Sequence, residues 1–374
     1  MTEHSDRLNE LNRRIPLHDR LVATHRSVSE VFPFIVRIAV AIYDPDTELL
    51  KTYLHSSGDE NPLSNYQADI NDVPSLRSIL EKGEPRVINN FLTFEDSSSE
   101  HTKRIGRSGY AASYTLPMFN EGEFYGFIFF NSDRVDVFTE KVLQQIDVYA
   151  HLISLMVINE ISSIDKLSAA VKTTGNLTHI RDPETGSHLD RMSRYSRLIA
   201  TELADKYDLD DNYIEHLFMF SPLHDIGKIG IPDNILLKPG KLDEGEKTIM
   251  ETHPRMGRDI IDELLKNFGM ENFAYIDMLR NIAEFHHEAI NGKGYPDGIK
   301  GNDIPIEARI VAVADVFDAL VSERPYKEAW SNERAFEILK ELSGEVLDAD
   351  CVNALLNNIE DIEKIQKYFD DRIY

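Results

Sequence analysis

Seven potential metal ligands, five histidines and two aspartates, are spread over the second half of this chain in segments of helical pattern. They are His188, His224, Asp225, His253, His286, His287 and Asp315. Taken singly, such a histidine is more often a surface or core residue than a ligand. Helix bundles, however, build metal sites from side chains on facing helices. The set therefore predicts an all-α second domain in which five segments surround a metal cluster.

The chemistry of these side chains indicates more than one ion. Asp315 follows the apolar run 310–314, where an unpaired carboxylate is costly to bury and needs a cation. Neighbouring positions on a helix point about 100° apart, so His224 and Asp225 cannot easily serve one face of one ion, and we predict that Asp225 bridges two. Nitrogen and oxygen ligands without thiolate disfavour a structural zinc site and suit Fe, Mn, Co or catalytic Zn. Metal-assisted hydrolysis of a phosphate ester is the reaction that this pattern favours.

The charge balance limits the partners of the chain. With 40 Lys and Arg against 65 Asp and Glu, the formal net charge is -25. Binding to duplex nucleic acid or to an anionic membrane needs basic patches, so neither is expected. A phosphodiester substrate would have to be attracted by local positive charge. Physiological salt confines the repulsive field to about 8–10 Å, so metal ions and a few cations can attract it at short range.

Cysteine content and hydropathy bear on location. Cys351 is the only cysteine, which rules out a disulfide within the chain and favours a reducing compartment. The N-terminal residues are too polar for a signal peptide. We find no run of about 18 apolar residues that would span a bilayer. The expectation is a cytoplasmic protein without a membrane segment.

Residues 1–138 have the pattern of a mixed α/β domain. Strands are predicted at 37–43, 49–54, 86–88, 112–118 and 124–130, and a helix at 75–82. The runs 38–44, 83–88 and 122–128 resemble those of a GAF domain, which implies a GAF-like sensory domain. The Asn-Lys-x-Phe-Asp-Glu run of GAF domains that bind cyclic nucleotides is absent, so the ligand stays open. A structural or dimerising domain without ligand is the alternative.

Residues 139–174 are predicted to form one long linker helix. Apolar residues recur there at alternating spacings of three and four, which is typical of a two-stranded coiled coil. We therefore predict a homodimer whose seam contains Ile153, Val157 and Ile164. The alternative is an amphipathic helix packed against its own domain.

Residues 175–374 are predicted to be helical nearly throughout. The expected helices cover 187–206, 211–225, 243–267, 272–287, 306–322, 331–343 and 349–357. The runs 181–188, 223–233 and 286–298, with Gly294-Tyr295-Pro296 in the last, resemble the HD-GYP family of cyclic-dinucleotide phosphodiesterases. The likeness continues through 304–320 and 324–327. It implies an HD-type metal-dependent hydrolase domain.

The resemblance also implies roles for individual residues. His188, His224, Asp225 and Asp315 match the ligands of a first metal, and Asp225, His253, His286 and His287 match those of a second. Glu184 matches a glutamate that helps some members to hold a third ion; the alternative is an exposed acid near a helix N-terminus. Two or three divalent transition-metal ions are therefore expected, with iron favoured and manganese or another divalent metal as alternatives.

Four residues match family positions that meet the substrate. Lys228 matches a lysine set against the scissile phosphate; otherwise it is a cation near a helix C-terminus. Tyr295 lies on a glycine-rich loop, from which it would stack on a base or bond a phosphate, unless it packs only to close the loop. Arg324 and Lys327 match positions that contact the base or phosphate; the alternative is an exposed pair.

The expected activity is hydrolysis of cyclic di-GMP to linear pGpG, to GMP or to both, by attack of a metal-bridging hydroxide and under regulation by the N-terminal domain. A phosphodiesterase for 3',3'-cyclic GMP-AMP shares the same backbone chemistry and is the first alternative. A non-catalytic cyclic-dinucleotide receptor is the second, and the complete ligand set argues against it. A nucleotidase acting on single nucleotides is the third, and the Gly294-Tyr295-Pro296 loop argues against it.

Overall fold

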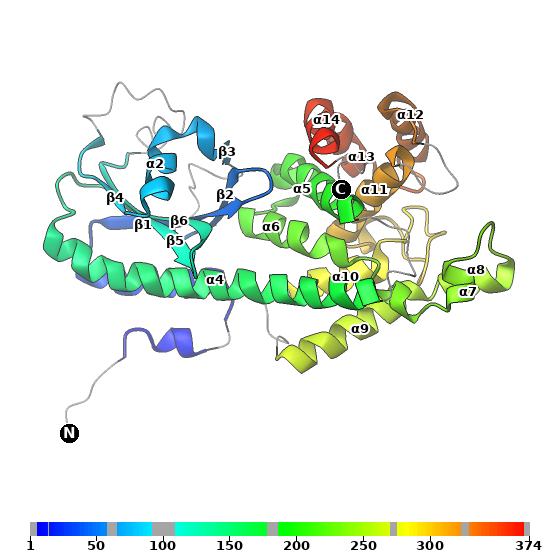
Figure 1. Ribbon diagram of the computed structural model, residues 1–374, viewed down its shortest axis with the longest axis horizontal. Coiled ribbons are helices and arrows are strands. Elements are labelled where there is room, and N and C mark those ends of the chain that lie inside the picture. Colours follow the sequence, from blue (N-terminus) through cyan, green and yellow to red (C-terminus); the bar gives the residue numbers. More distant parts are fainter. Residues whose placement is uncertain are drawn as a thin grey trace. The chain divides into compact units, whose positions relative to one another are not determined.

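The computed structural model describes residues 6–13, 15–57, 66–91, 109–177, 186–269, 275–322 and 329–369. The backbone divides into two compact units, Met1–Ser163 and Ile164–Tyr374. Figure 1 shows that the first unit contains the sheet and that the second is built from helices. The units have separate hydrophobic cores, as expected of two domains that each bury their own apolar surface.

A six-stranded antiparallel sheet forms the first unit. Its strands, in spatial order, are β3 (Gln67–Asp69), β2 (Leu49–His55), β1 (Ile35–Asp44), β6 (Glu123–Ser132), β5 (Ala112–Asn120) and β4 (Arg86–Ile88). Side chains alternate between the two faces, so one face packs with helix α1 (Leu17–Val31) and the other with α2 (Pro74–Lys82). The predicted α/β architecture is confirmed.

The long helix α4 (Glu140–Leu177) is part of this packing. Ile146, Ala150, Ile153 and Val157 are buried in the core between α4 and the sheet, and Ile164 is buried in the core of the second unit. The predicted dimer seam is therefore wrong for these residues. The apolar sheet face has to be covered, and the same helical stripe that would suit a partner helix covers it. The homodimer itself stays a prediction.

Two hydrogen bonds fix α4 to the sheet. Tyr114 donates from its hydroxyl to Asp147 Oδ1 at 2.5 Å, and Tyr53 donates to Glu160 Oε1 at 3.4 Å. By length and composition alone, the α4 segment Glu140–Lys166 could cross a membrane, and the expectation of a chain without a membrane segment stays a prediction. One face of this segment lies in the core of the first unit, which accounts for the apolar residues on that face.

The second unit is helical, as predicted. Its α-helices are α5 (Gly186–Tyr207), α6 (Asp211–Phe220), α7 (Asp233–Leu236), α8 (Glu244–Met250), α9 (His253–Phe268), α10 (Ile276–Phe285), α11 (Ile306–Val321), α12 (Asn332–Leu342), α13 (Ala349–Leu356) and α14 (Ile359–Tyr368). Helix α11 is apolar except for Glu307, Arg309, Asp315 and Asp318, and it packs against α5, α10 and α12. It is the central helix of this core.

Two predicted helices are broken by proline. The helix expected at 211–225 ends at Phe220 and continues as short 3-10 turns, because Pro222 has no N–H to donate to the Phe218 carbonyl; the Ser221 hydroxyl donates to it instead. The helix expected at 243–267 is split into α8 and α9 at Pro254. Both breaks lie within two residues of a predicted histidine ligand.

Candidate metal centre

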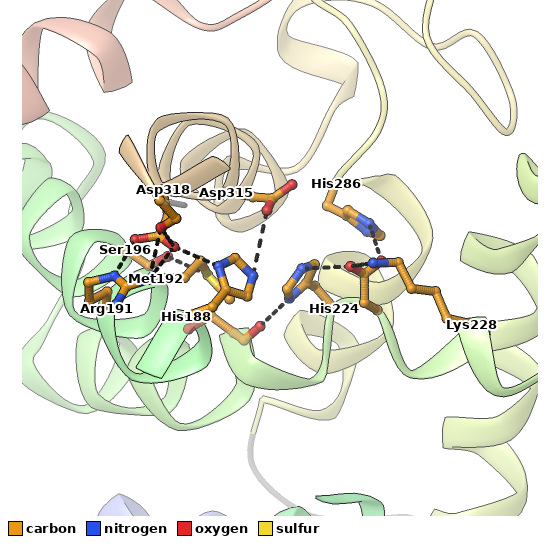
Figure 2. Close-up of polar contacts among 12 residues, drawn as sticks. His188, Arg191, Met192, Ser196, His224, Lys228, His286, Asp315 and Asp318 are labelled. Atoms are coloured by element: carbon orange, nitrogen blue, oxygen red, sulfur yellow. Dashed lines mark hydrogen bonds and ion pairs between the residues drawn. The ribbon is translucent and has the colours of Figure 1, made fainter. Parts of the chain in front are cut away.

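The structure brings all seven predicted metal ligands together in two groups. Within each group the potential ligand atoms lie within 4.8 Å of one another. The four-residue group is Asp225, His253, His286 and His287, and the three-residue group is His188, His224 and Asp315. Figure 2 shows that His224 lies between His188 on one side and Lys228 and His286 on the other. Segments far apart in the sequence thus converge on one centre.

Asp225 faces both groups with different oxygens. Its Oδ1 lies 3.1 Å from His253 Nε2 and 3.5 Å from His286 Nε2. Its Oδ2 lies 3.1 Å from Nε2 of His224, in the other group. A carboxylate placed in this way can bind an ion on each side, which is the geometry that a bridging ligand needs.

The backbone orients three of the histidine rings. The carbonyl partners of their Nδ1 atoms are Ser221 O for His224 at 2.9 Å, Met250 O for His253 at 2.8 Å, and Ile282 O for His286 at 2.9 Å. A ring that donates Nδ1–H to a carbonyl keeps the lone pair of Nε2 for a metal. The Ser221 and Met250 carbonyls lie at the proline breaks described above, so the breaks help to aim the ligands.

The electrostatics of the centre suit a cation. Burial lowers the pKa of both His286 and His287, so the two imidazoles are neutral donors. Burial acts to raise the pKa of Asp225, but Lys228 and His224 hold it well below its usual value, so the group is a carboxylate. In the described part of the chain, Asp225 Oδ1, His253 Nε2 and His286 Nε2 are buried without a hydrogen-bond partner. Buried polar atoms of this kind need a partner, and a divalent ion would supply it.

One residue of this centre was missed by the sequence reasoning. Asp318 on α11 is wholly buried and accepts hydrogen bonds from His188 Nδ1 at 2.7 Å and from Arg191 Nε at 2.7 Å. In Figure 2 His188 lies between Asp318 and Asp315, so that Asp318 holds the ring whose Nε2 faces the ligand group. Asp315 and Asp318 are three residues apart on one helix face. A second aspartate three residues after Asp315, in the same apolar helix, was the feature of the sequence that could have identified Asp318.

We expect Asp318→Asn to weaken metal binding at the His188 group by about 10–100-fold, because the carboxylate orients the ring and increases its basicity. The change also removes the counter-charge of buried Arg191, so the free energy of unfolding should fall by about 3–5 kcal/mol. Competition with a chromophoric chelator and urea denaturation measure the two effects. Ser322→Ala, which removes one hydrogen bond from Asp318, is the control and should change both much less. Unchanged metal affinity in Asp318→Asn would show that His188 needs no orienting carboxylate.

Lys228 lies beside the cluster. Its Nζ is 2.7 Å from Asp225 Oδ2, and its side chain is 19% exposed, so it is both next to the ligands and within reach of a bound molecule. The 3-10 turn that carries it, Ile226–Gly230, packs tightly on α9: a Cβ at Gly227 would lie 1.9 Å from the carbonyl oxygen of His253. Glycine is required here for the close approach that places Asp225 and Lys228 against His253.

Tyr295 lies over two histidines of the four-residue group. Its ring stacks on His287 with centroids 4.7 Å apart and an interplanar angle of 30°, and it lies 6.3 Å from the His253 ring. Burial, followed by the charge of Asp225, raises the pKa of Tyr295 well above its usual value. The group is therefore a neutral phenol that can donate a hydrogen bond. The other predicted site residues, Glu184, Arg324 and Lys327, lie outside the described residues.

Two family models match this chain. Residues 183–351 match the HD domain and residues 17–157 match the GAF domain. Among solved structures, a phycocyanobilin-bound GAF domain from a cyanobacterial phytochrome aligns with 40% of this chain and 89% of its own, at 17% identity and a TM-score of 0.33. An HD domain implies binding of divalent metal, in agreement with the ligand groups.

Curated relatives are similar over the helical part. The "Cyclic di-GMP phosphodiesterase response regulator RpfG" of Xanthomonas campestris pv. campestris is 46% identical over 185 residues, which are 50% of this chain and 46% of that protein. A "Probable cyclic di-GMP phosphodiesterase" of Vibrio cholerae is 42% identical over 221 residues, 58% of this chain and 50% of that protein. The "3'3'-cGAMP-specific phosphodiesterase 2" of Vibrio cholerae is 33% identical over 259 residues, 66% of this chain and 48% of that protein. The chain thus spans about half the length of these relatives.

Proposed function

We propose that this chain, which carries a GAF domain followed by an HD domain, is an HD-GYP phosphodiesterase that hydrolyses cyclic di-GMP to pGpG and GMP under control of its GAF domain. The observation that carries the proposal is the pair of histidine and aspartate groups joined by Asp225. Two groups in contact through one carboxylate are typical of two-metal phosphodiesterases. The names of the relatives in X. campestris and V. cholerae support the same substrate class.

The proposed chemistry divides between the ions and the side chains. Divalent ions bound to the two groups would activate water for attack on phosphorus and offset negative charge on the phosphate. Asp225 holds both ligand groups at a fixed separation. Lys228 lies where it can meet the negative charge that grows on the phosphate in the transition state. Tyr295 presents a neutral phenol beside His287 and would hold the substrate by stacking or by donating a hydrogen bond.

The metal that we propose is iron, with manganese as the alternative. The ligand groups contain only nitrogen and oxygen donors, which suit these ions. The single cysteine, Cys351, is buried and unpaired, in agreement with the cytoplasmic location that we propose. A reducing cytoplasm would keep iron in the divalent state. Glu184 is the candidate ligand for a third ion, and elemental analysis of wild type against Glu184→Ala would count it.

Anaerobic metal reconstitution followed by chromatography of the products tests the function. The metal-free chain is loaded with iron or manganese and incubated with cyclic di-GMP, 3',3'-cyclic GMP-AMP and cyclic di-AMP in turn. We expect the linear dinucleotide from cyclic di-GMP, and no product after chelation. Preference for cyclic GMP-AMP would support the second candidate, which the name of the 33% identical relative favours. Tight binding without cleavage in the loaded protein would instead make it a receptor.

We also propose that the chain forms a homodimer, through a face of α4 that the core leaves open. Val148 and Leu155 are 69% and 65% exposed, and half-buried Leu152 and exposed Asn159 continue the same stripe. These positions, 148, 152, 155 and 159, have the alternating spacing of a coiled-coil seam. Exposed leucine and valine in this spacing favour a second copy of the helix, and a single asparagine in the seam is a common determinant of its register.

Asp at both Val148 and Leu155 should convert the dimer to a monomer, because two charges would be buried in each half of the seam. Multi-angle light scattering over a range of concentrations measures this. The matched control is Gln144→Asp, which adds a charge to an exposed position beside the stripe and should leave the dimer intact. A monomeric wild type, or a dimer that survives the double change, would contradict the seam.

A further inference from the structure

The loop that carries Tyr295 folds back onto the ligand segment that precedes it. The Tyr295 N–H donates to the His287 carbonyl at 3.2 Å, and the Gly301 N–H donates to the Ile290 carbonyl at 3.0 Å. A Cβ at Gly294 would lie 2.3 Å from the backbone nitrogen of Ala289, so the loop rests directly on the peptide that follows the ligands. The position of the tyrosine ring over His287 therefore depends on what holds this loop down.

Glu288 is the residue placed to hold it. It follows the two ligands His286 and His287 but belongs to neither ligand group. Its side chain turns away to the loop, and Oε1 accepts hydrogen bonds from the backbone N–H of Asp297 at 2.7 Å and of Gly298 at 3.0 Å. The residue is only 6% exposed. Two backbone N–H groups bonded to one side-chain oxygen in a water-poor position form a strong clamp.

A second contact, at the solvent-exposed surface, holds the same loop. The Asp297 carboxylate pairs with Arg255 on α9, but the Arg255 side chain is 61% exposed and that of Asp297 is 35% exposed. An exposed ion pair contributes little, because water and salt screen it. We therefore expect the hydrogen bond from the Asp297 N–H to Glu288 to hold the loop more strongly than the ion pair of Asp297 with Arg255. Because both contacts involve Asp297, removing its carboxylate is a control that leaves the Glu288 contact in place.

We propose that Glu288 is a positioning residue that fixes Tyr295 against the metal centre by clamping the backbone of Asp297 and Gly298. The inference rests on the proposed function, because Tyr295 matters only if a substrate lies there. Glu288 has no contact with substrate or metal in this role. It acts through the loop, so its loss releases the phenol and leaves the histidine and aspartate ligands in place.

A double-mutant cycle on the full, metal-loaded chain tests this. Glu288→Ala and Tyr295→Ala should each raise KM for cyclic di-GMP by about 10–100-fold and lower kcat by less, because both remove substrate positioning. Since Glu288 acts through Tyr295, adding Glu288→Ala to Tyr295→Ala should raise KM by no more than about threefold further. Glu288→Gln keeps an acceptor oxygen and should recover most of the loss. Asp297→Ala keeps the clamped N–H and should stay within about threefold of wild type.

Two further readouts make the outcome decisive. Metal content should be equal in all variants, and a loss in Glu288→Ala but not in Glu288→Gln would mean that Glu288 supports the ligands, which overturns the proposal. The proposal is also overturned if Glu288→Ala and Tyr295→Ala have additive effects on KM. Hydrogen exchange without substrate should be faster at 291–299 in Glu288→Ala and unchanged in Asp297→Ala; unchanged exchange in both also overturns it. If exchange behaves as expected but the wild type cleaves no cyclic dinucleotide, the proposed function fails and the clamp stands.

Discussion

Replacement of Asp225 by alanine should abolish hydrolysis and remove metal from both ligand groups. Among the residues that the structure describes, Asp225 is the one whose oxygens lie beside histidines of both groups, at 3.1 Å from His224 and from His253. Its loss removes a carboxylate oxygen from beside each group and takes from Lys228 the carboxylate with which it pairs. We expect turnover to fall by at least about 10⁴-fold, since the two ions and the geometry of attack are lost together.

Elemental analysis and single-turnover kinetics on the purified variant measure this effect. The matched control is Asp315→Ala, which removes a carboxylate from the three-residue group only. It should lower the occupancy of one ion and leave most of the other. If Asp225→Ala binds two ions per chain and turns over normally, no bridging carboxylate is needed. If Asp225→Ala and Asp315→Ala lose the same amount of metal, the two groups act as one site.

Replacement of Lys228 by alanine should lower kcat by about 10²–10³-fold while changing KM less. The Lys228 ammonium lies 2.7 Å from the shared carboxylate, where negative charge increases during attack on the phosphate. An interaction that is stronger in the transition state than with the bound substrate changes kcat first. Lys228→Arg should recover part of the rate, because it keeps the charge but changes the geometry.

Metal loading has to be matched in this comparison. Lys228 helps to keep the pKa of Asp225 low, so removing the lysine raises that pKa and lets acid displace metal at a higher pH than in wild type. Assays near pH 8 with equal metal content separate that effect from catalysis. Lys247→Ala, at a lysine that is 64% exposed, is the control and should have no effect. Cleavage of bound substrate by Lys228→Ala at the wild-type rate would remove the lysine from the mechanism.

The amino-acid sequence was sufficient for the fold class and for the choice of the seven candidate metal ligands that the structure brings together. Apolar runs bounded by turn residues predicted five of the six strands of the first unit, and helical periodicity predicted α5, α6 and α10 to α13 to within a few residues, because both signals are local properties of the backbone. Strand β3 and helix α7 were not predicted, and α8 and α9 were expected as one helix. The seven ligands could be named because carboxylates and histidines in apolar helical segments are costly unless they bind something. Their arrangement in two groups agrees with the ligand sets implied by the family resemblance.

Packing decided what local periodicity could not. The apolar stripe with Ile153 and Val157 would suit a partner helix or the chain's own sheet equally well, and the sheet covers it. The pattern shows which residues share a face of α4 but not what lies against that face. Asp318 is likewise one more acid on α11 until folding places His188 and Arg191 against it.

The hydrogen bonds of Glu288 are the clearest example of a feature that only the tertiary structure decides. Its neighbours His286 and His287 suggest another ligand, yet its side chain turns to backbone N–H groups nine and ten residues away. Those donors carry no sequence signal, because every residue except proline has one. The sequence therefore determined which chemical groups this protein has. The tertiary structure decided which of them gather in the candidate metal centre and which orient its histidines or hold the loop, since that depends on distances between segments that no local pattern encodes.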